Sequence, residues 1–141
     1  MLSLNSIGKT FLSELGSKKE VFKNLNLQVN KGEFVTVIGS NGAGKSTLLN
    51  LVMGSIEPDC GTISLDDKDI TNIELYKKNS FISKVYQNPS LGTAPSMTVF
   101  ENLSMADNKG KSFNFTMGLN KKRREYYRTL LKELGLGIEE P

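Results

Sequence analysis

The sequence predicts an α/β fold, and three consecutive segments carry that prediction. Phe34–Ile38 is rich in β-branched residues and almost continuously apolar, which is typical of a strand covered on both faces. Gly39–Gly44 is a glycine-rich loop, and Lys45–Met53 has the apolar periodicity of a helix that ends at Gly54. A buried strand, a loop and a helix in this order favour layers of helices on a sheet.

Length and composition set the limits of this fold. The chain has 141 residues, which allows about one domain. Its 18 basic and 15 acidic residues give a net charge of +3, too balanced for a polybasic nucleic-acid binder. With Cys60 as the single cysteine and no histidine, zinc sites built on thiolate or imidazole and nucleophile pairs that use histidine are excluded. No apolar run approaches the roughly 18 residues of a membrane span, and no signal peptide is expected.

The segments before the central strand predict a short β region. Leu2–Ile7 is expected to be a first strand, and Gly16–Lys19 a turn. Leu25–Val29 alternates apolar and polar residues, as a half-buried strand does. Asn30–Glu33 has the composition of a turn.

The segments after the helix predict more strands. Gly61–Leu65 is expected to be a strand, followed by a turn at Asp66–Asp69 and a return that begins near Ile70. Phe81–Tyr86 is a further candidate strand, which ends before Pro89 because proline cannot continue a central strand.

The last third of the chain predicts helices. A short helix is expected over Thr98–Ala106, and residues 107–118 have the composition of a loop. Asn120 can cap a second helix that ends at Gly135. Between residues 109 and 132 there are eight basic residues against one acidic residue, Glu125. A solvated helix face explains this charge, and a contact with acidic lipid head groups or an acidic partner is the alternative.

The strongest chemical signal is a phosphate-binding loop that satisfies G-x-x-x-x-G-K-[ST] and stands between a predicted strand and a predicted helix. It comprises Gly39, Ser40, Asn41, Gly42, Ala43, Gly44, Lys45, Ser46 and Thr47. Glycines let the backbone curl so that successive N–H groups converge on an anion, and the helix start adds its positive dipole end. Lys45 can reach the β- and γ-phosphate oxygens, Ser46 can ligate Mg²⁺, and Thr47 can donate to the α-phosphate. The motif therefore predicts a nucleoside triphosphate with Mg²⁺ as ligand, without distinguishing among the classes of P-loop protein.

Four segments together resemble the nucleotide-binding subunit of ATP-binding cassette (ABC) transporters: Gly32–Val35, Ser46–Leu49, Val85–Pro89 and Met97–Leu103. The resemblance runs from about Leu2 to Glu140. It implies a P-loop NTPase-type core of antiparallel strands plus a parallel sheet, with the start of a helical subdomain. Residues 1–90 would form the ATP-binding core, and residues 91–141 the beginning of the helical subdomain.

The resemblance also implies roles for three residues outside the loop. Phe11 matches the aromatic position that stacks on adenine, and Val21 a position near the ribose. Gln87 matches the glutamine that completes Mg²⁺ coordination beside Ser46 and orients the attacking water, so that Lys45 and Gln87 are the implied catalytic residues. The alternatives are a core-edge phenylalanine, an ordinary strand valine and a strand-terminal polar residue.

The implied partners are a second nucleotide-binding subunit and a transmembrane permease, which would contact about Asn88–Asn108. No nucleic-acid partner is expected. The exposed candidates for this docking patch are Leu91, Pro95, Met97 and Phe100. The implied location is the cytoplasm, peripheral to the inner face of the cell membrane.

Three elements of the family pattern are missing: the apolar Walker B strand with its carboxylate, the Leu-Ser-Gly-Gly-Gln signature and the switch histidine. Ile63–Asp67 is similar to a Walker B strand because its apolar residues are followed by aspartates, but it is interrupted by Ser64 and has the composition of a hairpin. The resemblance therefore implies a chain truncated at its C-terminus, which binds MgATP weakly and hardly hydrolyses it. Three alternatives remain: a small kinase, a non-hydrolysing regulatory module, and an ABC-type ATPase that acts off the membrane.

Overall fold

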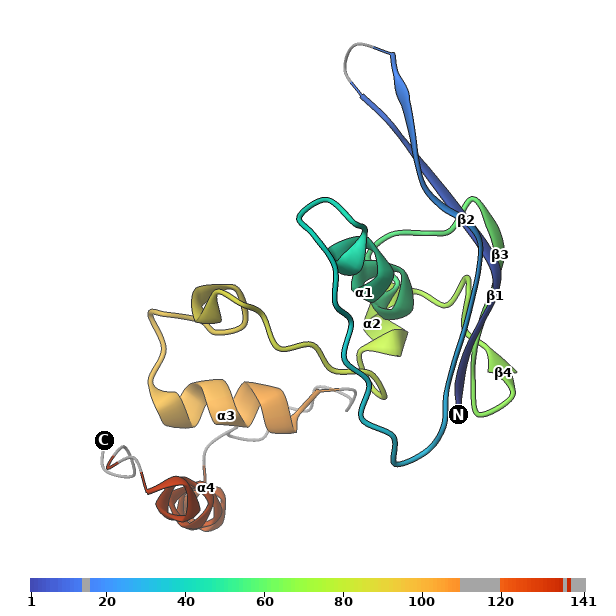
Figure 1. Cartoon of the computed structure of the whole chain (residues 1–141). Coiled ribbons are helices and arrows are strands. Elements are labelled where there is room, and N and C mark those ends of the chain that lie inside the picture. Colours follow the sequence, from blue (N-terminus) through green and yellow to red (C-terminus); the bar gives the residue numbers. More distant parts are fainter. Residues whose placement is uncertain (14–15, 110–119, 136, 138–141) are drawn as a thin grey trace. The chain divides into compact units, whose positions relative to one another are not determined.

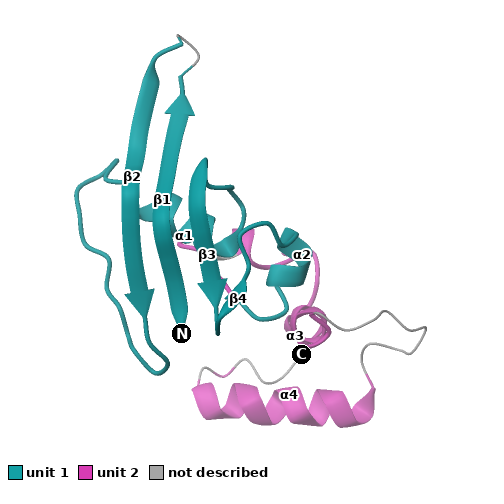
Figure 2. Cartoon of the chain, turned by 90° about the vertical axis from the view of Figure 1, so that its right-hand side faces the viewer, with its two compact units in different colours: residues 1–82 teal, residues 83–141 magenta. Residues whose placement is uncertain are grey.

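The computed structural model describes residues 1–13, 16–109, 120–135 and 137, and the chain divides into two compact units. Figure 2 colours unit 1, Met1–Ile82, and unit 2, Ser83–Pro141. The predicted division into a core of residues 1–90 and a helical subdomain of residues 91–141 stays a prediction.

Unit 1 is built on a four-stranded antiparallel sheet with the order β2-β1-β3-β4 (Figures 1 and 2). Its strands are β1 (Leu2–Leu12), β2 (Lys18–Val29), β3 (Cys60–Leu65) and β4 (Lys68–Asp69). The strands predicted at the N-terminus and around residues 61–65 are confirmed. The first two are longer than predicted, because β1 and β2 pair with each other as a long hairpin and so satisfy one another's backbone groups.

Helix α1 (Lys45–Met53) packs against one face of this sheet. Its Leu51 is buried with Leu4 and Ile7 of β1 and with Ile63 of β3. Gly54 ends the helix in the left-handed conformation, with φ of 80°, as the sequence predicts. A further short helix, α2 (Leu75–Lys78), has no clear signal in the sequence.

The predicted turn between β3 and β4 is confirmed. Asp66 and Asp67 both have positive φ, 48° and 63°, which is the backbone of the two-residue turns that match the twist of a hairpin. Ser64 pairs with Asp69, and Leu65 with Lys68. Ile63–Asp67 is therefore a hairpin, as its composition indicates.

The sheet that the structure describes is antiparallel, and the predicted parallel sheet is not seen among the described residues, so this part of the fold stays a prediction. Phe34–Ile38 and Phe81–Tyr86 have irregular conformations instead of strands. Phe34 is 94% exposed, Ile38 90% and Val85 96%. A strand needs neighbours for its backbone N–H and C=O groups, and no described strand pairs with either segment.

Unit 2 contains η1 (Pro89–Leu91), α3 (Val99–Asp107) and α4 (Lys121–Leu134). Both predicted helices are confirmed, and most of the predicted loop 107–118 lies outside the described residues. Thr98 and Asn120 cap the two helices with their side-chain oxygens. The helices pack through Phe100, Tyr127 and Leu131, which are buried together. Within the described residues, no helix is both long and apolar enough to cross a membrane.

Candidate nucleotide site

The phosphate loop leads directly into α1, and Gly44 stands at the N-cap of that helix. Gly44 has φ of 90°, a backbone conformation that residues other than glycine rarely adopt. Because it is glycine, it supplies no side chain to cap the helix. The N–H groups of the first turn have no partner within a helix, and the helix dipole makes this end positive. The loop and the first turn therefore present donors and positive potential that fit a phosphate group.

Lys45 folds back over its own loop. Its Nζ donates to the carbonyl oxygens of Gly39, at 2.7 Å, and Ser40, at 2.8 Å. The ammonium is thus held at the loop by neutral acceptors. Phosphate oxygens form stronger, charge-assisted hydrogen bonds with an ammonium than neutral carbonyls do, so these contacts can be exchanged for contacts with a nucleotide.

The β1–β2 hairpin packs against the phosphate loop at Gly44. A Cβ atom on Gly44 would lie 2.8 Å from Cγ1 of Val21 and 3.1 Å from Cζ of Phe22. The register of the hairpin explains why both neighbours reach the loop: Lys9 pairs with Phe22 and Thr10 with Glu20, so the pairing skips Val21. Such an irregularity re-aims side chains next to it.

The structure brings Val21 to the loop, while the predicted contact of Val21 with a ribose stays a prediction. The place of Phe22 beside the loop was not predicted, because a half-buried aromatic residue in a strand has no distinguishing signal of its own.

Phe11 lies farther along the hairpin and is 37% exposed. The Nζ of Lys9 stands 5.6 Å from the centre of its ring. Lys9 also forms an ion pair with Asp59, with Nζ and Oδ1 2.7 Å apart, and Asp59 accepts a hydrogen bond from the N–H of Thr10. The hydrogen bonds from Lys9 and Thr10 hold the pKa of Asp59 below its ordinary value. The ring is therefore available at the edge of the hairpin, and its stacking on adenine stays a prediction.

The remaining predicted site residues are divided between the units. Ser46 is exposed in the first turn of α1, and Thr47 beside it is half-buried. Gln87 is exposed in unit 2, in a segment without helix or strand. Its predicted place in the Mg²⁺ shell stays a prediction.

The predicted docking segment contains a hollow of about 450 Å³, lined in part by Pro95, Met97 and Val99. Leu91, Pro95 and Met97 are exposed, as predicted. The prediction is wrong for Phe100, which is 5% exposed because it packs in the core between α3 and α4.

Asn102, which sequence analysis did not single out, fixes the loop before α3. Its Oδ1 accepts from the N–H of Ala94 at 2.8 Å, and its Nδ2 donates to the carbonyl oxygens of Ala94, Met97 and Thr98. An amide with both acceptor and donor groups can hold such a loop at several points.

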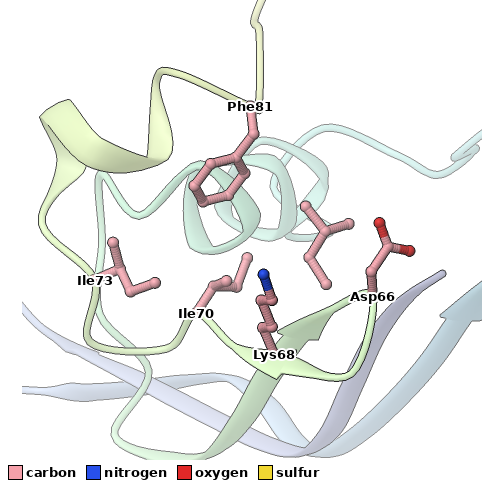
Figure 3. Close-up of a pocket in the computed structure, with 6 residues that line it drawn as sticks. Asp66, Lys68, Ile70, Ile73 and Phe81 are labelled. Carbon is pink, nitrogen blue, oxygen red and sulfur yellow. The ribbon is translucent and has the colours of Figure 1, made fainter. Parts of the chain in front are cut away.

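A separate hollow of about 290 Å³ lies in unit 1 and is lined mainly by apolar side chains. Figure 3 shows Ile70, Ile73 and Phe81 around it, with Lys68 and Asp66 from the β3–β4 turn region nearby. Asp66 is paired with the N-terminal amine of Met1, which lowers the pKa of its carboxyl. None of these residues belongs to the phosphate loop.

Comparison with known proteins identifies relatives of this chain. Residues 22–139 match the ABC transporter family. The tyrosine transport ATP-binding protein of Clostridioides difficile (strain R20291) is 49% identical over 122 residues, which cover 86% of this chain and 49% of that protein. The spermidine/putrescine import ATP-binding protein PotA of Vibrio cholerae is 39% identical over 104 residues, or 74% of this chain and 25% of PotA. The chain thus spans half or less of the length of these relatives.

Solved structures show the same fold. A dimeric bacterial ABC transporter cassette superimposes with a TM-score of 0.76 at 24% identity, covering 99% of this chain and 60% of the other. The structure of a nucleotide-free ATP-binding cassette from an ABC transporter gives a TM-score of 0.66 at 27% identity, covering 94% of this chain and 53% of the other. With its phosphate loop at the start of α1, this chain belongs to the ABC transporter family and represents part of its ATP-binding cassette.

Proposed function

We propose that this chain binds MgATP at the loop Gly39–Thr47. One observation carries the proposal: the loop ends in the uncapped start of α1, and the ammonium of Lys45 is held over the same loop by two carbonyl oxygens. Free N–H groups and a cation at one point fit a triphosphate.

Each residue of the proposed site would contact a different part of the nucleotide or its magnesium ion. The backbone N–H groups from Gly42 to Ser46 would bind the phosphate chain, and Lys45 would move from its carbonyl partners to phosphate oxygens. The hydroxyl of Ser46 would hold Mg²⁺, which neutralises the β- and γ-phosphates when it is bound. Phe11 would stack on the base, Val21 would lie against the ribose, and Gln87 would complete the metal shell.

Hydrolysis needs more than a phosphate cradle. It also requires a group that positions water and groups that offset charge on the γ-phosphoryl from both sides. The sequence of this chain contains no apolar strand that ends in a catalytic carboxylate and no histidine. We therefore expect these 141 residues to bind MgATP with negligible turnover.

In the whole protein, we propose that ATP hydrolysis drives the import of a small organic solute through a separate permease. The relatives support the direction of transport, because PotA is named as an import protein and the Clostridioides relative serves tyrosine transport. The hollow beside Pro95 and Met97 would receive the permease, since its lining is apolar and Asn102 fixes its rim. A second cassette would face the first across the nucleotides, and the pair would lie at the cytoplasmic face of the membrane.

Two segments that were predicted as strands but have irregular conformations also support the proposal of a longer whole protein. Phe34–Ile38 and Phe81–Tyr86 have strand-forming sequences and exposed apolar side chains. In relatives of about twice the length, further chain would supply the neighbours that these segments need.

Calorimetric titration with MgATP tests the binding proposal. The wild-type chain should release heat on binding, and Lys45→Ala should lower the affinity at least about tenfold, since it removes a charge-assisted contact of roughly 1.5–3 kcal/mol. Lys31→Ala, at an exposed lysine in the turn after β2 and outside the loop, serves as the control. Equal heats for wild type and Lys45→Ala would refute the proposed site.

A further inference from the structure

Lys19 brings an ammonium group to the phosphate loop although it lies outside the loop motif. A Cβ atom on Gly42 would stand 3.8 Å from the Nζ of Lys19. The same strand, β2, packs Val21 and Phe22 against Gly44. The contact between the hairpin and the loop therefore continues along β2 from Phe22 to Lys19, and it ends in a cation.

The pairing of the hairpin places Lys19 beside the predicted adenine-binding residue. Lys19 is the cross-strand partner of Phe11. Directly opposed residues of an antiparallel pair have their side chains on the same face of the sheet. A nucleotide whose base contacted Phe11 and whose phosphates contacted the loop would thus have to pass this ammonium.

Lys19 differs from the other lysines of the site in its partners. Lys9 is neutralised by Asp59, and Lys45 is held by the carbonyl oxygens of Gly39 and Ser40. Across the described part of the chain, the ammonium of Lys19 forms no hydrogen bond or ion pair. An ammonium without a counter-charge next to an anion-binding loop favours an anionic ligand.

We propose that Lys19 is a second cation of the nucleotide site, which contacts the phosphate chain and favours nucleotides with two or three phosphates over the monophosphate. This inference rests on the proposed binding of a nucleotide at Gly39–Thr47. It adds a determinant of specificity that comes from the hairpin rather than from the loop motif.

The test compares Lys19→Gln with Lys18→Gln in the full chain. Lys18 is the neighbouring exposed lysine, and it points to the opposite face of β2 because side chains alternate along a strand. Each variant is titrated calorimetrically with the magnesium complexes of ATP and ADP, and with AMP and adenosine. Thermal unfolding without ligand checks that both variants fold as the wild type does.

Lys19→Gln should weaken ATP binding about three- to tenfold, since two unit charges about 4 Å apart in water change an equilibrium roughly fivefold. The loss should decrease from ATP to ADP to AMP and vanish for adenosine. Lys19→Arg should retain the affinity, and Lys18→Gln should bind as the wild type does. Raising the salt from about 0.05 M to 0.5 M should reduce the difference between wild type and Lys19→Gln, because salt screens this contact.

Two results would overturn the inference alone: equal ATP affinities for the Lys19→Gln and Lys18→Gln variants, or an equal loss for ATP and adenosine. If the wild-type chain binds none of the four compounds, the proposed function fails as well. The two failures are therefore distinguishable in one set of titrations.

Discussion

Gly44 shows how one residue joins the local backbone to the site. It has to adopt a positive φ so that the loop can turn into α1, and it has to lack a side chain because Val21 and Phe22 approach it closely. These two demands have different causes. The first arises from the steric limits of the backbone, and the second from the hairpin that packs on the loop.

Gly32 offers a matched comparison for Gly44. It also has a positive φ, 83° against 90°, but a Cβ atom there would meet nothing within 4 Å. Gly32→Ala should lower the free energy of unfolding by about 1 kcal/mol, the cost of a strained φ alone. Gly44→Ala should lower it by about 2–4 kcal/mol, because overpacking against Val21 adds to the strain. Urea unfolding without nucleotide measures both, and equal losses would show that the hairpin does not press on the loop.

At the scale of elements, the helices follow their local signals closely. Thr98 and Asn120 fix the starts of α3 and α4 through side-chain hydrogen bonds, and Gly54 and Gly135 end α1 and α4 in the left-handed conformation. Whether a predicted strand forms depends on whether another strand is present to pair with it. β1 to β4 each pair with another described strand, whereas Phe34–Ile38 pairs with none of them. Strand propensity cannot reveal whether a partner is present, so the parallel sheet stays a prediction.

The cap of α3 provides a test at this scale. The Oγ1 of Thr98 accepts from the N–H of Glu101, and the Glu101 carboxylate accepts from the N–H and the hydroxyl of Thr98. Thr98→Ala should destabilise α3 by about 1 kcal/mol. Amide hydrogen exchange across Val99–Asp107 measures the loss, with Ser96→Ala as the control outside the cap. Equal exchange rates in the two variants would contradict the role of the cap.

The same cap should depend on pH in a defined direction. The hydrogen bonds from Thr98 lower the pKa of Glu101 from its ordinary value of 4.5. A carboxyl whose pKa is lowered by folding stabilises the folded state above its ordinary pKa, and that contribution is lost as the pH falls through the lowered value. The difference between Thr98→Ala and wild type should therefore be complete at neutral pH and shrink below about pH 4.5.

At the scale of the whole molecule, the residues of the predicted site are divided between two compact units. The loop, Phe11 and Val21 belong to unit 1, and Gln87 belongs to unit 2. The loop could be predicted from sequence because its residues are contiguous and each type has a chemical reason to be there. The approach of Lys19 and Phe22 to the loop could not, because it depends on the register of a hairpin that skips one residue.

The most direct test of nucleotide binding at this loop is the change in amide chemical shifts of the isotope-labelled chain when MgATP is added. The largest changes should fall on Gly42–Thr47 and on the facing part of β2, and they should disappear in Lys45→Ala. Unchanged loop amides, or changes centred on the hollow around Ile70 and Phe81, would contradict the account.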